Sequence, residues 1–348
     1  MDRNILFSLR GCTFENIFCS FHADEALAVF MLKQVDDFKD AKIIRTRDPK
    51  IIEKADIVVD VGAEYLPEKN RFDHHQRSFN STFSDNHKVT KLSSAGLIYK
   101  HFGREVLKSV LSKINPQDQE LIETIYQKLY TDFIEGMDAV DNGVSQYPAG
   151  VEKFYKESTS ISKRISRLNP WWNEANVDVD ERFYQAVEVV GLEFLDIAKS
   201  IAYSWIPARD IVGKAIARRY NLKKSENISF FRKDIHTSGK IIILDQFCPW
   251  KEHLYNFEKE LNLNIEEKIL FVLYEDQSKS WRVQAVSESS DSFVSRKTLP
   301  ERWMGLRDEN LSKESEIADC IFVHASGFIG GNKTKNGALE MAIKAITI

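Results

Sequence analysis

The sequence lacks the features that mark membrane, secreted and fibrous proteins. No apolar run approaches the roughly 18 to 20 residues of a membrane-spanning helix, because Lys, Asp or Glu interrupts the richest stretches. The chain has only 15 Gly and 8 Pro in 348 residues, too few for a fibrous or low-complexity protein. Its four cysteines are scattered without the spacing of a disulfide framework, which favours a reducing compartment. We therefore expect a soluble, globular, intracellular protein that does not bind membranes.

The sequence also lacks a strong charge of one sign. The net charge of −4 gives no general basic field, so any contact with nucleic acid must be local or carried by bound cations. Residues 1–19 mix charged with apolar residues and contain no clear targeting peptide. A length of 348 residues exceeds that of a typical single domain, which favours two domains.

The first third of the chain alternates short apolar runs with helix-like segments, as a parallel α/β sheet does. Residues 41–45 and 56–61 have the length and composition of strands, and 24–35 has those of a helix. Asp48-Pro49 predicts the start of a short helix. The expected order is strand, helix, strand, short helix, strand, followed by helices at 91–102 and 117–140.

The pattern weakens between residues 146 and 172, which include the Ser-rich basic run STSISKRISR. We place a domain boundary there, between 1–165 and 166–348. Beyond it, a helix is expected at 182–205 and strands at 239–244, 268–274 and 280–285. A Gly-rich turn and a helix at 337–346 close the chain. The predicted fold class is α/β, with an N-terminal parallel-sheet domain and a smaller C-terminal α/β lobe.

Acidic and imidazole residues follow the predicted early strands, where open α/β sheets place their ligands. His22 and Asp24 lie two residues apart on the turn into the first helix and could share one metal. In isolation, an N-cap Asp beside a surface His is the favoured interpretation. Asp60 ends the apolar run IVVD, and a carboxylate buried there needs a cation or a hydrogen-bond donor as partner. Asp60 could therefore be a metal ligand, or it could cap the loop that follows.

Asp73-His74-His75 is the most conspicuous of these groups, because the chain has only 8 histidines. Neutral imidazoles can serve as metal ligands, and the neighbouring Asp can orient them. The alternative interpretation is that these histidines lie in a solvated loop and bind no metal. Asp138 and Asp141 lie three apart on one face of the predicted helix, near its C-terminal end. Carboxylates there oppose the helix dipole unless a cation compensates, although two surface aspartates would look the same.

Carboxylates combined with histidines, rather than thiolates, favour Mn²⁺ or Mg²⁺. Two such ions about 3.5 to 4 Å apart would activate a water and stabilise the leaving oxygen in phosphodiester or phosphoanhydride hydrolysis. A zinc site containing Cys19 and His22 is less favoured, because no CxxC pair accompanies them. The sequence thus predicts a two-metal phosphoesterase.

The second half contains further candidates for phosphate binding. The segment 324–333 (HASGFIGGNK) has three glycines beside Ser326 and Lys333, which could let backbone N–H groups approach a phosphate. A tight turn before the last helix explains the glycines equally well. Arg282 could clamp a phosphate, although most arginines are merely at the surface. Four tryptophans could stack on bases but are more often core residues: Trp171, Trp172, Trp205 and Trp303.

Taken in order, these motifs resemble the melanocyte-proliferating-gene family of 3′–5′ RNA exonucleases (UPF0160-type), a branch of the DHH phosphoesterase superfamily. The resemblance runs from about Ser20 to the C-terminus. It is carried by SFHADEALA, IIRTRDP, IVVDVG, RFDHHQRSF, KLSSAGLIYKHFG, DAVDNG and HASGFIGGNKTKNGALEMA.

The resemblance implies a DHH-like metal-binding catalytic domain at 1–165, a substrate-binding domain at 166–348, RNA as substrate, and a nuclear or mitochondrial location. The implied ligands of two Mn²⁺ or Mg²⁺ ions are His22, Asp24, Asp60, His74 and one of Asp138 or Asp141. Asp73 and His75 are the implied catalytic residues, with His75 facing the substrate phosphate. The segment from His324 to Gly331 resembles the lobe that binds substrate. The expected substrate-binding residues are therefore Arg77, Arg282, His324, Ser326, Gly327, Gly330, Gly331 and Lys333.

The chain departs from the family pattern at its start, where the family has a Thr-His-Asn-Gly-Thr-like run. Ile17 stands in place of the expected ligand His. An apolar side chain cannot coordinate a hard cation, so Glu15 or His22 would have to hold one metal instead. Two alternatives to an active exonuclease follow: an RNA-binding paralogue without turnover, and a small-molecule phosphoesterase or pyrophosphatase that uses the same centre.

Overall fold

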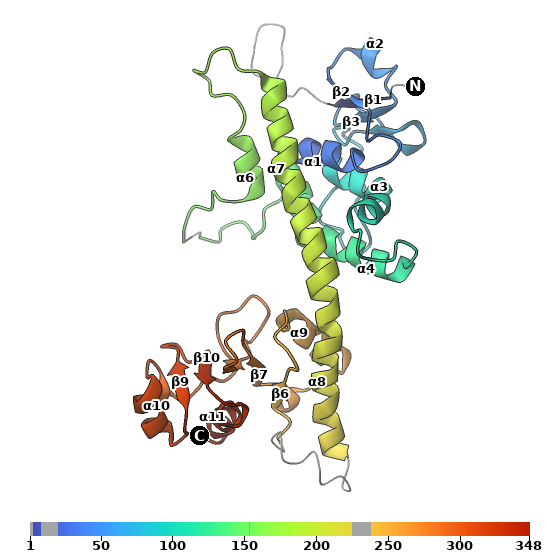
Figure 1. The fold of residues 1–348 in the computed structure, drawn as a ribbon. Helices are drawn as coiled ribbons and strands as arrows, with labels where there is room; N and C mark the ends of the chain where they lie inside the picture. Colours follow the sequence, from blue (N-terminus) through green and yellow to red (C-terminus); the bar gives the residue numbers. More distant parts are fainter. Residues whose placement is uncertain (1–2, 8–19, 153, 225–237) are drawn as a thin grey trace. The chain divides into compact units, whose positions relative to one another are not determined.

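The chain divides into two compact units, Met1–Ala202 and Tyr203–Ile348, in a computed structural model that describes residues 3–7, 20–152, 154–224 and 238–348 (Figure 1). Each unit is built around a five-stranded mixed sheet with helices, so the α/β class expected from the sequence is confirmed.

The division falls after Ala202 and not at the predicted boundary between residues 165 and 166. Helix α7 (Val179–Ser200) packs on α1 (Ala23–Leu32) inside the N-terminal unit. The rings of Phe183 and Phe21 meet edge to face at 5.6 Å, and those of Phe194 and Phe30 lie 6.0 Å apart. The weak pattern at 146–172 therefore does not mark the boundary between the units, because the buried face of α7 completes the core of the N-terminal unit.

The N-terminal sheet has the strand order β2-β1-β3-β5-β4. Its strands are β1 (Asn4–Phe7), β2 (Lys42–Arg45), β3 (Ile57–Val59), β4 (Tyr65–Leu66) and β5 (Arg71–Phe72). The first four in spatial order are parallel, as predicted, and β4 pairs antiparallel with β5 at the edge. A short 3₁₀ turn, η1 (Pro67–Lys69), joins β4 to β5 and ends at Asn70 in the left-handed conformation, which makes this pair a hairpin.

The helices of the N-terminal unit follow the predicted order. Asp48 caps α2 (Pro49–Ile52) by accepting a hydrogen bond from the Lys50 N–H at 2.9 Å. The helix expected at 117–140 is one run with a π-helical insertion, comprising α4 (Gln119–Leu129), η2 (Tyr130–Ile134) and α5 (Glu135–Asp141). The remaining helices are α3 (Ser94–Val110) and α6 (Ile161–Ser166).

The C-terminal unit has the strand order β6-β7-β8-β10-β9, in which only β6 and β7 are parallel. The three predicted strands are β6 (Ile241–Ile243), β7 (Phe271–Glu275) and β8 (Trp281–Ala285), and β9 (Cys320–Val323) was not foreseen. The π-helical turn η3 (Ile201–Trp205) contains the division between the units. The other elements of the C-terminal unit are α8 (Ile206–Lys224), α9 (Lys251–Glu260), η4 (Ile265–Glu267), η5 (Glu301–Trp303), α10 (Asp308–Ser315) and α11 (Lys335–Thr347).

The expected Gly-rich turn is in part wrong, because Gly330 and Gly331 lie in strand β10 (Ile329–Asn332). Of these three glycines, Gly327, with φ at +70°, is the one that lies in a turn requiring glycine. Among the described residues, no helix is both long and apolar enough to cross a membrane.

Candidate metal centre

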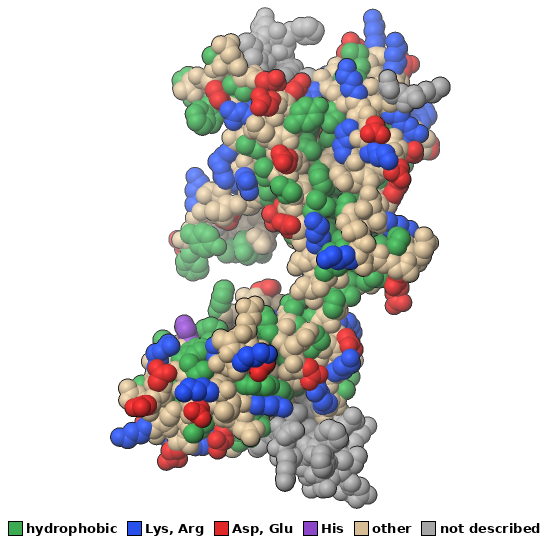
Figure 2. All heavy atoms as spheres, viewed as in Figure 1, with side chains coloured by type: hydrophobic (Ala, Val, Ile, Leu, Met, Phe, Trp, Pro, Cys, Tyr) green, Lys and Arg blue, Asp and Glu red, His purple; other side chains and the backbone are tan. Residues whose placement is uncertain are grey.

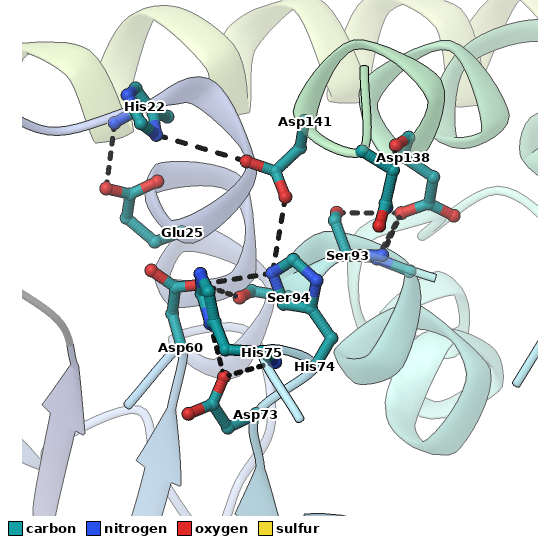
Figure 3. A network of polar contacts seen from close by, with 12 residues as sticks. His22, Glu25, Asp60, Asp73, His74, His75, Ser93, Ser94, Asp138 and Asp141 are labelled. Atoms are coloured by element: carbon teal, nitrogen blue, oxygen red, sulfur yellow. Dashed lines mark hydrogen bonds and ion pairs between the residues drawn. The ribbon is translucent and has the colours of Figure 1, made fainter. Parts of the chain in front are cut away.

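The candidate metal centre lies at the carboxyl ends of neighbouring parallel strands (Figure 3). Asp60 directly follows β3, and Asp73-His74-His75 directly follows β5. The pairing of β3 with β5 brings these residues to one edge of the sheet, although they are far apart in the sequence. The first turn of α1 and the last turn of α5 complete the site from the helical layer.

Asp60, His74 and His75 form the first ligand group, in which one ligand atom from each residue lies within 4.8 Å of the others. Nε2 of His74 lies 3.3 Å from Oδ1 of Asp60, and Nδ1 of His75 lies 3.8 Å from the same oxygen. Asp60 has a left-handed backbone with φ at 62°, which is costly for a residue other than glycine and is typical of functional sites. The Ser94 hydroxyl donates to Oδ1 of Asp60 at 2.7 Å and orients this strained carboxylate.

Asp73 orients His75 and does not belong to either ligand group. Its carboxylate accepts hydrogen bonds from the N–H of Ala63 at 2.6 Å and of His75 at 3.1 Å, and its Oδ1 lies 2.5 Å from Nδ1 of His75. Burial acts to raise the pKa of Asp73, but the hydrogen bonds and charge of His75 outweigh it and lower this pKa below its ordinary value. The ionised carboxylate fixes the His75 ring, whose side chain is 43% exposed and so remains reachable.

His22, Asp24 and Asp141 form the second ligand group, again with ligand atoms within 4.8 Å of one another. Nδ1 of His22 lies 3.9 Å from Oδ1 of Asp141, and Glu25 accepts a hydrogen bond from the His22 N–H at 2.8 Å. Oδ2 of Asp141 lies 3.2 Å from Nε2 of His74. His74 therefore stands between Asp60 and Asp141, and the two ligand groups adjoin through it (Figure 3).

Asp138, the other candidate in α5, points away from both ligand groups toward the start of α3. Its Oδ1 accepts from the Ser93 N–H at 2.9 Å, the Ser93 hydroxyl at 2.7 Å and the Gly96 N–H at 3.0 Å. Its Oδ2 accepts from the Tyr130 hydroxyl at 2.9 Å. Burial raises the pKa of Asp138 to about 7, although these donors oppose the rise. The sequence could not decide which of the two aspartates is the candidate ligand. In the structure, Asp141 lies in a ligand group and Asp138 lies at the N-terminus of α3.

The electrostatics of the two groups fit a divalent cation. Asp24, Glu25 and Asp60 are all buried, and burial together with the nearby charge of Asp60 raises the pKa of Glu25. Buried carboxylates at this density repel one another unless a proton or a cation intervenes. The donors are carboxylate oxygens and imidazole nitrogens, which suit Mn²⁺ or Mg²⁺ and do not require thiolates.

A cleft opens at each ligand group. One, of about 790 Å³, is lined by Asp60, Asp73 and His75 together with Arg47 and Arg71. The other, of about 240 Å³, is lined by the second group, His22, Asp24 and Asp141, and by α6 residues that include Ser162, Lys163 and Ser166. Substrate can therefore approach the candidate centre along walls that carry basic and hydroxyl groups.

The substrate-binding residues expected from the sequence belong to both units. Arg77 is exposed, two residues after His75, and the others belong to the C-terminal unit. There Arg282 pairs with Asp276 and lies over the Phe322 ring at 5.3 Å. The other contacts are local: Nδ1 of His324 lies 2.9 Å from Oγ of Ser326, and Nζ of Lys333 lies 3.8 Å from Asp319. Gly327, Gly330 and Gly331 lie in the turn and strand already described.

Sequence reasoning missed Ser94, Glu25 and Asn169. Ser93-Ser94 at the start of a predicted helix was a recognisable cap signal, but nothing linked it to Asp60. Asn169 lies in the segment of weak pattern and carried no signal of a role. Its side-chain amide accepts from the N–H of Phe21 and donates to the carbonyl of Phe21, both at 2.8 Å, next to His22. Ile17, Glu15 and Cys19, on which the expected departure from the family and the zinc alternative rest, lie outside the described residues.

The chain is an α/β protein with a candidate metal centre. Carboxylates and histidines at the strand ends and helix ends form two neighbouring ligand groups in this centre. The chain belongs to the MYG1 family, because the family model described as "MYG1_exonuc: Uncharacterised protein family (UPF0160)" matches residues 13–346. The predicted resemblance to the melanocyte-proliferating-gene family is thereby confirmed.

Relatives match over nearly the whole chain. The "MYG1 protein" of Dictyostelium discoideum is 50% identical over 329 residues, covering 94% of each chain. The "MYG1 exonuclease" proteins of Mus musculus and Homo sapiens are both 46% identical over 328 residues, covering 93% of this chain and 82% of theirs. No solved structure matches the chain.

Proposed function

We propose that this protein is a metal-dependent 3′–5′ exonuclease acting on RNA, with two Mn²⁺ or Mg²⁺ ions in the two ligand groups. The observation that carries the proposal is that the two groups are neighbours. Nε2 of His74, in the first group, lies 3.3 Å from Oδ1 of Asp60 and 3.2 Å from Oδ2 of Asp141, which belongs to the second group. The printed name "MYG1 exonuclease" of the mouse and human relatives supports the nuclease class.

Asp60, His74 and His75 would hold one ion, and His22, Asp24 and Asp141 the other. Bound there, the ions would activate a water and neutralise the charge that develops on the phosphoryl group and the leaving oxygen. Oδ1 of Asp141 faces His22 and its Oδ2 faces His74, so this carboxylate could contribute a ligand to either group. Glu25 holds the backbone of His22, and Ser94 holds the carboxylate of Asp60.

The Asp73–His75 pair supplies the half-exposed polar group of the site. Asp73 accepts a hydrogen bond from Nδ1 of His75 and so fixes the orientation of this ring at the first ligand group. Because the His75 side chain is 43% exposed while that of His74 is 6% exposed, His75 is the better placed of the two to meet a substrate.

In this proposal the N-terminal unit is a DHH-type catalytic domain and the C-terminal unit binds substrate. The C-terminal candidates, Arg282 and the segment 324–333, would then contact the RNA chain beyond the reacting phosphate. The resemblance in motif order supports these roles. Gly331 is the weakest of them, because Arg282 and Phe322 occupy the space beside its Cα.

The test is cleavage of 5′-end-labelled single-stranded RNA by the full chain with added Mn²⁺ or Mg²⁺. We expect products that shorten progressively from the 3′ end, loss of cleavage in EDTA, and loss in the Asp141→Asn variant. Cleavage that persists in EDTA and in Asp141→Asn would refute the proposal. Single-stranded DNA of the same sequence, run in parallel, tests the preference for RNA.

The same preparation separates the two alternative functions. Faster release of phosphate from pyrophosphate than of nucleotides from RNA would favour a small-molecule phosphoesterase. RNA binding without turnover would favour an impaired paralogue, and Ile17→His would then be expected to restore cleavage. Metal content of the purified chain, measured by mass spectrometry, reports directly on whether two ions are held per chain.

A further inference from the structure

The segment of residues 147–172 carries one wall of the cleft at the second ligand group. Helix α6 presents Ser162, Lys163 and Ser166 to the same cleft of about 240 Å³ that His22 and Asp141 line. Lys163 is exposed there. One ammonium group and two hydroxyls are donors suited to the oxygens of a phosphodiester.

The segment 147–172 is also basic in an otherwise acidic chain. It contains five Lys or Arg and two Glu, a formal charge of +3, whereas the whole chain carries −4. The basic side chains include Arg164 and Arg167, which are exposed like Lys163. A local positive charge beside a site that handles phosphate favours a polyanion as its partner.

Large aromatic side chains are exposed along the same segment. Trp171 and Trp172 are 67% and 85% exposed, and Phe154 and Tyr155 are 101% and 77% exposed. By contrast, Trp303, also considered for base stacking, is fully buried in the C-terminal core. In Figure 2, basic and hydrophobic side chains lie beside one another on the flank of the N-terminal unit that carries α6. Exposed rings that cluster in one segment mark a binding surface.

Two contacts fix this segment to the candidate centre. The amide of Asn169 bonds the backbone N–H and carbonyl of Phe21, each at 2.8 Å, one residue before His22. The Ser162 hydroxyl contacts Sδ of Met137 in α5 at 3.6 Å. Trp171 follows Asn169 by two residues, so its Cα lies within about 7 Å of that of Asn169. The exposed rings therefore begin close to the second ligand group.

We infer that residues 147–152 and 154–172 form a binding surface for single-stranded RNA, in which Lys163 contacts the backbone near the reacting phosphate and Trp171 and Trp172 stack on bases. Basic side chains interleaved with exposed rings are the recurring means of holding single strands, since every base has a face to stack. A duplex hides these faces, so a single strand is the better match. The inference rests on the proposed function and names the surface that positions its substrate.

The test measures binding apart from turnover. Fluorescence anisotropy of a labelled 20-nucleotide RNA is recorded with the full chain in EDTA, for the wild type and for a Trp171→Ala/Trp172→Ala double variant. We expect the double variant to bind about ten- to a hundredfold more weakly, and a Trp171→Tyr/Trp172→Tyr variant to recover most of the affinity. A duplex of the same length should compete poorly.

Lys163→Ala should weaken binding more modestly and reduce the slope of log affinity against log salt by about 0.7, as loss of one phosphate contact does. The matched controls are Phe293→Ala and Lys313→Ala, at exposed positions of the C-terminal unit, which should bind as the wild type does. Circular dichroism establishes that each variant is folded.

The outcomes separate this inference from the proposed function. Unchanged RNA affinity in the Trp double variant, with cleavage by the wild type, overturns the surface and leaves the exonuclease intact. Weakened binding in the variants without any cleavage by the wild type supports the surface and refutes the exonuclease. No RNA binding by the wild type overturns the surface and points to a protein as the partner of the exposed rings.

Discussion

The N-terminal unit gathers acidic and imidazole side chains from four separate stretches into two adjoining groups, whereas the Gly-rich segment of the C-terminal unit pairs its polar side chains locally. In the first unit, His74 meets Asp60 and Asp141, which come from a strand end and a helix end. In the second, His324 meets Ser326, two residues along the chain.

The difference teaches which kind of signal predicts a site. Parallel strands end on one edge of a sheet, so polar residues at successive strand ends meet wherever the sheet forms. Glycines carry no such constraint, since they serve close packing as readily as phosphate binding. A Cβ on Gly331 would lie 2.5 Å from Nη1 of Arg282 and 2.9 Å from the Phe322 ring, so packing already accounts for this glycine.

Replacing one histidine in each unit gives the largest expected contrast. His74→Ala removes the side chain shared by Asp60 and Asp141, and we expect RNA cleavage to fall about 10³-fold, equivalent to several kcal/mol of lost metal catalysis. Metal content, measured by mass spectrometry, should fall with it.

The matched variant His324→Ala should retain both metals and lose less activity, because His324 contacts only nearby residues such as Ser326 and Phe328. Equal losses in the two variants would break the comparison, since they would place the C-terminal segment at the reacting centre.

A smaller effect is expected from Asp73→Asn, which keeps the shape of the residue but weakens the orientation of His75. Loss of a carboxylate that orients a site histidine typically costs 10- to 100-fold in activity or metal affinity. The change should appear in kcat for RNA cleavage. Asp276→Asn, the same substitution beside Arg282 in the C-terminal unit, is the control and should leave kcat near that of the wild type. An unaltered kcat in Asp73→Asn would show that His75 needs no orienting partner.

The sequence predicted those parts of the fold that rest on long or strongly patterned segments. The order of the early strands and helices, the cap at Asp48 and the last helix were all foreseen. Strands β4 and β5 have two residues each, too few for a periodic signal. The choice between Asp138 and Asp141 was also out of reach, because residues three apart share a helix face. Tertiary packing brings the donors of Ser93, Gly96 and Tyr130 to Asp138, and these contacts distinguish it from Asp141.

Gly331→Ala tests whether glycine in β10 serves packing. We expect the C-terminal unit to lose about 1 to 3 kcal/mol of stability, the usual cost of overpacking. Gly136→Ala, in α5 where a Cβ meets nothing within 4 Å, should instead gain about 0.5 to 1 kcal/mol. Urea denaturation measures both. If Gly331→Ala keeps its stability but loses RNA affinity, Gly331 serves phosphate binding and not packing. The Gly-rich segment of the C-terminal unit would then be a binding site, as the strand ends of the N-terminal unit are in this proposal.

The smallest effect expected is a pH dependence that separates Asp138 from the ligand groups. Burial raises its pKa to about 7, so the folded chain binds more protons than the unfolded chain, whose Asp has a pKa near 3.9. The stabilisation is therefore fully present below about pH 4 and lost as pH rises through about 7. Asp138→Asn removes this titration, and its free energy of unfolding should change less between pH 6 and pH 8 than that of the wild type, by on the order of 1 kcal/mol. Asp291→Asn, at an exposed position, should follow the wild type. An Asp138→Asn variant with the full pH dependence would mean that Asp138 is ionised across this range and balanced by a cation, which would return it to the metal centre.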